Sequence, residues 1–435
     1  MRSFFLRFYL CIAILGWVGC RGQNVDPVVP ADTALSNNLP PLEVAPDDWP
    51  WWRGPQRNNH AQGPLPPLTW STTQNVLWKT EVPGRGHATP CLWGDAIFIS
   101  TADEAKESQQ LHCYDRQSGK LRWTCELHGA GFMKAHAKNS HASATPACDG
   151  EHVFVAYLAV DALWVAALTL EGTIAWRAQA GPFASEHGYG SSPVIYESLV
   201  IVAGDNVNQG YITALHRETG KIVWRTARGA DPSYGTPILV TTAGRDQLLL
   251  SGQRTMVSYN PATGEELWNS LGPAEVTANT VAWNEDFVFA SGGYPETGIL
   301  AIRSDGGGEI AWRSEGKVYV PSPLATRDRL YIVQDNGVAK CLNAETGEEI
   351  WSKRLGGAFS ASPLLCGDVV FAANEAGVVF VFKAADRYEE LARNDLRESI
   401  FASPVIAGGR LYLRTDRHLY CIGQPSSKED RADTH

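Results

Sequence analysis

A tryptophan recurs along most of the chain at spacings of 39 to 53 residues. From residue 123 onward, each recurrence closes a similar phrase, in which a polar turn ending in Gly lies between short apolar runs. LHRETGKIVW and LNAETGEEIW are two examples. Because Gly readily adopts the positive φ of a tight hairpin turn, each phrase predicts two antiparallel strands. The repeat tryptophans are Trp78, Trp123, Trp176, Trp224, Trp268, Trp312 and Trp351.

A second phrase, Ser/Thr-Pro followed by a β-branched or aromatic run, alternates with the first. It occurs seven times, from Thr89-Pro90 to Ser403-Pro404, and one further unit has Thr280-Val281 in its place. The two phrases define eight units of four short strands, named A to D in chain order. The last unit lacks strand D, whereas an unpaired D-like run, 76–82, precedes the first unit.

These ends predict a closed ring. A fixed repeat of this length is typical of propellers, and closure removes the exposed sheet edges that an open array would leave. We therefore predict an all-β, eight-bladed β-propeller over 76–422, with the N-terminal strand completing the last blade. The tryptophans are expected to pack between neighbouring blades.

Composition narrows the function classes. The net charge is −10, and only 19% of the residues are charged, which disfavours a nucleic-acid binder. The hydrophobic content of 44% excludes disorder of the whole chain.

The N-terminus predicts export to the periplasm or cell envelope. Arg2 and Arg7 precede an apolar run, 8–18, that is shorter than the ~20 residues of a membrane span, so residues 1–19 are expected to be a signal peptide. Gly19-Cys20 predicts lipidation at Cys20, and a plain signal peptide cut nearby is the alternative. The Pro-rich range 20–47 is expected to be a disordered tether and 423–435 a disordered tail. The protein would then contact the membrane only through its lipid anchor.

A Trp-rich segment with the sequence WWRGP precedes the repeats. Within 48–75 it contains Trp49, Trp51, Trp52 and Arg53. We expect it to pack on the propeller. Because Trp and Arg are frequent at binding hot spots, a partner site is the alternative.

Two loops between strand D and the next strand A are expanded. The step from Trp123 to Thr145 is 22 residues and that from Trp176 to Ser192 is 16, whereas the others are 10 to 12. Loops on rigid scaffolds often carry function, so 126–143 and 177–191 form the candidate surface. No catalytic residue or metal site is predicted. The candidate ligand-binding or partner-binding residues are His87, His136, His141, Glu186, His187, Tyr189, Tyr234 and Tyr319. Solvated loop histidines and channel-filling tyrosines without a shared role are the alternative.

The repeat phrases resemble a known family. ITALHRETGKIVW, MVSYNPATGEELW and VAKCLNAETGEEIW are similar to the pyrroloquinoline quinone (PQQ)-like repeats of quinoprotein alcohol dehydrogenase-like proteins. With eight units, a signal-like start and Gly19-Cys20, the chain also resembles BamB-type outer-membrane assembly lipoproteins. That resemblance implies a monomeric, non-catalytic scaffold for envelope proteins, with an outer-membrane barrel assembly among the expected partners.

Two other functions stay open. A quinoprotein dehydrogenase would use PQQ and Ca²⁺, and the resemblance implies an adjacent Cys-Cys pair beside the cofactor. The sequence contains no Cys-Cys, so no cofactor is predicted. A carbohydrate-binding propeller is the second alternative, supported by the aromatic residues at the channel mouth.

Overall fold

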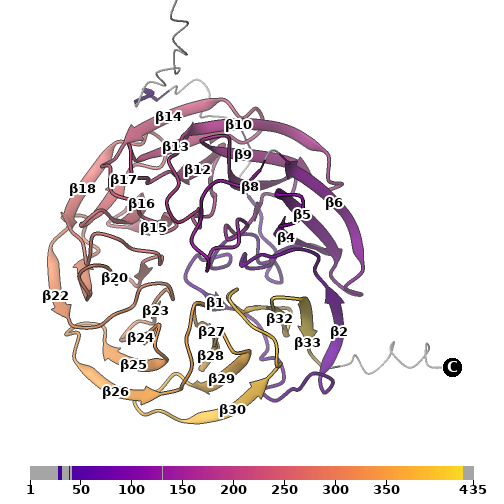
Figure 1. The fold of residues 1–435 in the computed structure, drawn as a ribbon. Helices are drawn as coiled ribbons and strands as arrows, with labels where there is room; N and C mark the ends of the chain where they lie inside the picture. Colours follow the sequence, from indigo (N-terminus) through magenta and orange to yellow (C-terminus); the bar gives the residue numbers. More distant parts are fainter. Residues whose placement is uncertain (1–27, 32–38, 40–41, 130, 425–435) are drawn as a thin grey trace, which may run out of the picture.

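The computed structural model describes residues 28–31, 39, 42–129 and 131–424. Its regular elements are strands, arranged in eight sheets around a central axis (Figure 1). The prediction of an all-β, eight-bladed propeller is confirmed. The described residues contain no helix that could cross a membrane. The expected signal peptide, Cys20 and nearly all of the expected tail lie outside the described residues.

Blades 1 to 4 follow one another in the chain. Blade 1 contains β3 (Cys91–Trp93), β4 (Ala96–Asp103), β5 (Ser108–Asp115) and β6 (Leu121–His128). Blade 2 contains β7 (Ala147–Cys148), β8 (His152–Ala159), β9 (Ala162–Thr169) and β10 (Ile174–Pro182). Blade 3 contains β11 (Val194–Tyr196), β12 (Leu199–Ala203), β13 (Tyr211–His216) and β14 (Ile222–Ala227). Blade 4 contains β15 (Ile238–Thr242), β16 (Arg245–Gly252), β17 (Thr255–Tyr259) and β18 (Glu266–Leu271).

Blades 5 to 8 complete the ring. Blade 5 contains β19 (Ala282–Trp283), β20 (Phe287–Gly292), β21 (Gly298–Arg303) and β22 (Ile310–Ser314). Blade 6 contains β23 (Leu324–Ala325), β24 (Arg329–Val333), β25 (Val338–Asn343) and β26 (Glu349–Arg354). Blade 7 contains β27 (Leu364–Cys366), β28 (Val369–Ala373), β29 (Val378–Lys383) and β30 (Glu390–Asp395). Blade 8 contains β31 (Val405–Ala407), β32 (Arg410–Arg414), β33 (His418–Ile422) and, from the N-terminal end, β2 (Val76–Glu81).

The N-terminal strand closes the ring as predicted. β2 pairs antiparallel with β33, and Trp78 lies opposite Cys421. Glu398, which precedes β31, bonds to both of these strands: Lys79 of β2 donates to its carboxylate at 3.0 Å, and so does the Tyr420 hydroxyl of β33. The ends of the propeller are therefore joined by a sheet ladder and by a hydrogen-bonded carboxylate.

The repeat tryptophans connect neighbouring blades. The indole N–H of Trp176 donates to the carbonyl of Arg217 in the next blade at 2.9 Å, and Trp123 and Trp312 make the same kind of bond. Trp268 differs, because its N–H donates to Gln247 of its own blade. Each outermost strand has a one-residue β-bulge just before the repeat Trp, or before the residue that takes its place. Such bulges twist the edge of a sheet away from pairing with a further strand.

The Ser/Thr-Pro residues form a ring of hydrogen bonds around the channel. The backbone N–H of Thr145 donates to the Ser192 hydroxyl at 3.0 Å, and that of Ser322 donates to the Ser362 hydroxyl at 2.9 Å. Six such links hold one innermost strand to the next. This satisfies backbone donors that would otherwise face the channel.

The Trp-rich segment crosses one mouth of the channel, at the carboxyl ends of the A strands. Trp49 exchanges backbone hydrogen bonds with Leu92 of blade 1. Farther along, Arg53 donates to the Pro323 carbonyl of blade 6 at 2.8 Å, and β1 (His60–Ala61) adds a parallel strand to β27 of blade 7. β1 lies near the middle of the ring in Figure 1.

Part of the range expected to be a tether makes contacts. Val29 exchanges backbone hydrogen bonds with Arg225 of β14, and Leu42 and Val44 pack against the core of blades 2 and 3.

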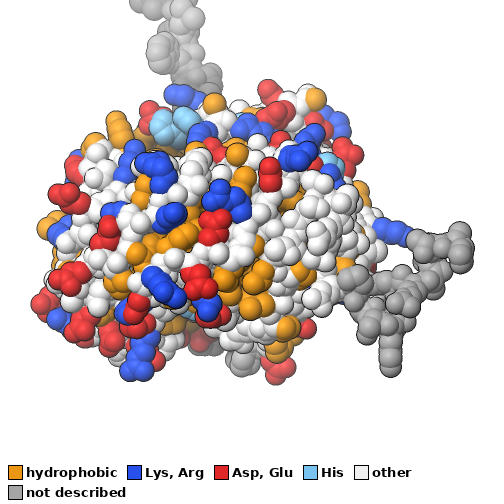
Figure 2. All heavy atoms as spheres, turned by 90° about the horizontal axis from the view of Figure 1, so that it is seen from below, with side chains coloured by type: hydrophobic (Ala, Val, Ile, Leu, Met, Phe, Trp, Pro, Cys, Tyr) orange, Lys and Arg blue, Asp and Glu red, His pale blue; other side chains and the backbone are white. Residues whose placement is uncertain are grey.

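The rim of the propeller, seen in Figure 2, carries acidic and basic side chains next to one another.

Candidate functional site

A cavity of about 500 Å³ lies on the propeller axis, between the D-to-A loops and the Trp-rich segment. Trp52 lines it from the side of that segment, and the indole N–H of Trp52 donates to the Thr280 hydroxyl at 2.8 Å. Thr280 belongs to the unit in which Val replaces the Pro of the repeat. Trp52 therefore forms a floor, and the cavity faces the two long loops.

The structure brings five of the eight candidate residues together in this cavity. They are His87, His136, His187, Tyr234 and Tyr319. His141 and Tyr189 instead line a separate cavity of about 10 Å³. Glu186 is exposed and lines neither cavity.

His141 and Tyr189 hold the loops in shape. The His141 ring stacks on Phe132 at 4.1 Å between centroids, and the Tyr189 hydroxyl donates to the Ala203 carbonyl at 3.0 Å. Sequence spacing could not separate these two residues from His136 and His187 of the cavity group, because the four residues share the two long loops.

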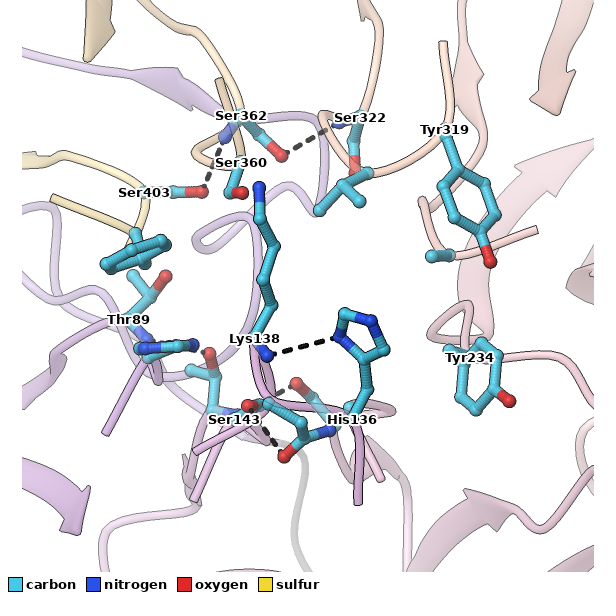
Figure 3. A pocket seen from close by; sticks show the side chains of 18 of the residues that line it. Thr89, His136, Lys138, Ser143, Tyr234, Tyr319, Ser322, Ser360, Ser362 and Ser403 are labelled. Carbon is cyan, nitrogen blue, oxygen red and sulfur yellow. Dashed lines mark hydrogen bonds between the residues drawn. The ribbon is translucent and has the colours of Figure 1, made fainter. Parts of the chain in front are cut away.

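One wall of the cavity is aromatic. The His187 ring stacks on Tyr234 at 6.2 Å, and His136 meets His187 edge to face at 5.8 Å. The Nδ1 atom of His136 accepts the backbone N–H of Lys138 at 3.1 Å (Figure 3). The proton of a neutral His136 ring therefore sits on Nε2 and is available to a ligand.

The opposite wall is uncharged. His87 stacks on Phe401 at 4.4 Å between centroids. Burial lowers the pKa of His87 to about 3, with smaller contributions from the nearby Arg414 and Arg85 charges. His87 is therefore neutral at ordinary pH.

The charged groups of the lining are already paired. Lys138 reaches across the cavity (Figure 3) and donates to Glu375 of blade 7 at 3.0 Å. The Asp335 carboxylate accepts the backbone N–H groups of Tyr319 and Val320 at 2.8 and 3.1 Å. Lys138 and Asp335 were not among the predicted ligand-binding residues, and Trp52 was expected only as part of the Trp-rich segment, because that prediction rested on loop histidines and on residues close before the A strands.

The two long loops are bound to each other. The His136 N–H donates to the His187 carbonyl at 3.1 Å, and the Asn139 side chain donates to the Tyr189 carbonyl at 3.2 Å. The Ser185 hydroxyl donates to the Lys134 carbonyl at 2.5 Å. The loops therefore form one surface over the cavity, while Lys138 and Glu186 remain exposed on it.

The lining does not fit PQQ with Ca²⁺. PQQ carries three carboxylates, whereas the cavity offers one ammonium, Lys138, which is already paired with Glu375. Calcium takes six to eight oxygen ligands. Among the described residues, no group of three or more His, Cys, Asp or Glu side chains is arranged to hold a metal ion.

The fold and the repeat contacts define a propeller of PQQ-like repeats. The chain belongs to the family of the outer membrane protein assembly factor BamB, whose model matches residues 71–313 and 296–389.

Individual relatives are distant. BamB of Legionella pneumophila (strain Paris) is 23% identical over 227 residues, which is 52% of this chain and 48% of that protein. This chain therefore spans about half the length of that curated relative. The structure of BamB from Moraxella catarrhalis superposes with a TM-score of 0.59 at 15% identity, over 83% of this chain and 98% of that one. The structure of the quinohemoprotein alcohol dehydrogenase from Comamonas testosteroni superposes with a TM-score of 0.62 at 12% identity, over 87% of this chain and 81% of that one. At these identities the two structures establish the fold alone.

Proposed function

We propose that the chain is an exported, non-catalytic scaffold that binds other envelope proteins and takes part in outer-membrane protein assembly. Membership of the BamB family supports the cellular role. The joined long loops are the observation that carries the scaffold function. Because hydrogen bonds hold them together before any partner arrives, binding costs less ordering of the loops.

The loop surface offers the groups that a partner would use. Lys138 and Glu186 are exposed there with opposite charges, and His136 and His187 add exposed aromatic area. Polar and charged side chains of this kind are typical of the solvent-accessible rim of a protein interface. The opposite mouth is occupied by the protein's own Trp-rich segment, so we propose that partners bind on the loop side.

Site-specific photocross-linking in cells tests this proposal. A photoreactive residue replaces Ala137 or Glu186, and the matched control replaces Glu345, an exposed residue in a turn on the opposite face. We expect both loop positions to cross-link to a component of the outer-membrane barrel assembly, and position 345 not to do so. Equal cross-linking at all three positions, or none to that assembly, would contradict the proposal.

The quinoprotein alternative has a direct test. Purified protein is titrated with PQQ in the presence and absence of Ca²⁺, and dye-linked alcohol oxidation is followed. We expect no saturable binding at high micromolar quinone, because the cavity cation is already neutralised. Calcium-dependent binding with turnover would make the cavity an active site and overturn the scaffold proposal.

A further inference from the structure

The axial cavity has the form of a small-ligand site. Its volume of about 500 Å³ falls in the range of cavities that hold small molecules, roughly 300–1,000 Å³. The Trp52 N–H is used by Thr280, so Trp52 presents mainly its ring to the cavity. A ligand entering past the loops would meet an aromatic floor.

Aromatic side chains also make up much of one wall. Tyr234 and Tyr319 both line it, and in Figure 3 His136 lies between these two residues and Lys138. The Tyr234 hydroxyl is buried without a hydrogen-bond partner in the described structure and points away from the middle of the cavity (Figure 3). Tyr234 can therefore act on a ligand through its ring rather than through its hydroxyl.

Hydrogen-bonding groups remain available around this apolar surface. Thr89 lines the cavity, is 2% exposed, and its hydroxyl has no hydrogen-bond partner in the described structure. It lies at one of the two points where the described ring of Ser/Thr hydrogen bonds lacks a link. The Nε2–H of His136 and the third proton of the Lys138 ammonium are further donors. A buried hydroxyl without a partner costs free energy, which a bound ligand would recover.

The charge balance selects the ligand class. Lys138 is paired with Glu375, Asp335 holds two backbone N–H groups, and His87 is neutral. An anionic or cationic ligand would lose its hydration without gaining a free counter-charge. The lining therefore favours a neutral, polar ligand.

An extended peptide fits less well than such a ligand. A peptide needs partners for its own N–H and C=O groups, and strand addition would supply them from a free edge. Around this cavity, the backbone N–H groups of Thr145, Ser192 and Ser322 are used by neighbouring hydroxyls. The cavity wall therefore offers few backbone donors for strand addition.

We propose that the axial cavity binds a neutral oligosaccharide of two or three pyranose units. The apolar C–H face of a pyranose packs on Tyr234, Tyr319 and Trp52, and its hydroxyls bond to Thr89, His136 and Lys138. Aromatic rings bind such apolar faces through their large, flat surfaces. This site goes beyond the scaffold function and does not depend on it.

Titration of the full mature protein tests the site. The probes are maltotriose and triacetylchitotriose, followed by calorimetry and by tryptophan fluorescence, with Trp52→Phe used to assign the optical signal. We expect saturable binding of at least one probe with a Kd of about 0.1 to 10 mM. Absence of saturable binding by both probes in that range overturns the proposal. Tighter binding of an alternating aromatic–polar decapeptide than of either probe also overturns the proposal.

Four tyrosine variants, one of them a control, localise the binding. Tyr234→Ala is expected to weaken probe binding at least tenfold, whereas Tyr234→Phe keeps it within twofold, because the ring and not the hydroxyl makes the contact. The matched control is Tyr196→Ala, which removes a tyrosine outside the cavity and should leave binding unchanged. Thermal melting verifies folding, and Tyr319→Ala provides a second removal of a cavity ring. Equal losses in Tyr234→Phe and Tyr234→Ala, or loss in Tyr196→Ala, overturn the proposal.

Discussion

The indole of Trp176 lies directly over Gly220 of the next blade. A Cβ atom placed on Gly220 would come within 2.6 Å of the indole carbon Cε3. Gly220 also has a φ of 68°, in the left-handed region. The same pairing joins Trp78 to Gly119 and Trp312 to Gly347. The Gly of each repeat phrase therefore serves its own hairpin turn and the tryptophan of the preceding blade.

We predict that Gly220→Ala destabilises the propeller more than a turn substitution alone would. The matched control is Gly244→Ala, because Gly244 has a φ of 72° and its added Cβ meets nothing within 4 Å. Left-handed backbone costs a non-glycine residue about 1–2 kcal/mol in both variants. Displacement of the indole adds about 1–3 kcal/mol to Gly220→Ala only. Urea unfolding measures both, and equal losses would show that the indole contact contributes nothing.

Trp224→Ala should cost about 3–5 kcal/mol of unfolding free energy. Trp224 is fully buried, and its N–H donates to the Pro261 carbonyl of the next blade at 3.2 Å. The substitution therefore leaves a cavity between two blades. Leu271→Ala, at a side chain that is 69% exposed, serves as control and should change stability by less than about 0.5 kcal/mol. A loss below about 1 kcal/mol for Trp224→Ala would contradict this packing.

Acid should weaken the closure of the ring at Glu398. Burial raises the pKa of this carboxyl, but hydrogen bonds from Thr415, His418, Lys79 and Tyr420 outweigh that effect and lower it to about 2. In the unfolded chain the pKa returns to 4.5. The stability from ionised Glu398 is therefore present above pH 4.5 and is lost as the pH falls toward 2.

The comparison of wild type with Glu398→Gln isolates this contribution. Chemical unfolding at several pH values should give a large difference in stability near pH 6 and a shrinking difference below pH 4.5. A difference that does not vary with pH would mean that the Glu398 carboxylate is not held ionised by these bonds.

His87 should stay uncharged across the physiological range. Since burial lowers its pKa to about 3 from the ordinary 6.5, the unfolded chain takes up the proton first, and stability falls as the pH drops through this interval. NMR of ring-labelled histidines, with His87→Gln for assignment, should show no titration of His87 between about pH 5 and pH 8. A midpoint above pH 5 would mean that the wall formed with Phe401 is open to water.

The fold could be predicted because its determinants recur. The Trp of one phrase packs on the Gly of the following phrase, so one local pattern, present in six of the eight units, specifies the contact between blades. The unpaired run 76–82 and the incomplete last unit together indicated how the ring closes, and the pairing of Trp78 with Cys421 agrees.

The cavity could be predicted only in part. His87, Tyr234 and Tyr319 hold equivalent places before the A strands, so the repeat brings them to one mouth. Lys138 could not be found in this way, since its position depends on Glu375, 237 residues away in blade 7. Trp52 bonds to Thr280 across 228 residues from a segment outside the repeat. Neither contact leaves a local pattern in the sequence.

The pairing of β2 with β33 also imposes an order of events on synthesis. β2 leaves the ribosome before the other propeller strands, yet its partner Cys421 follows Trp78 by 343 positions. Joining ends so far apart is slow, because a long loop has to close before the contact forms. A chain that stops before residue 418 leaves β2 without its partner strand. Ring closure thus distinguishes a finished chain from an interrupted one.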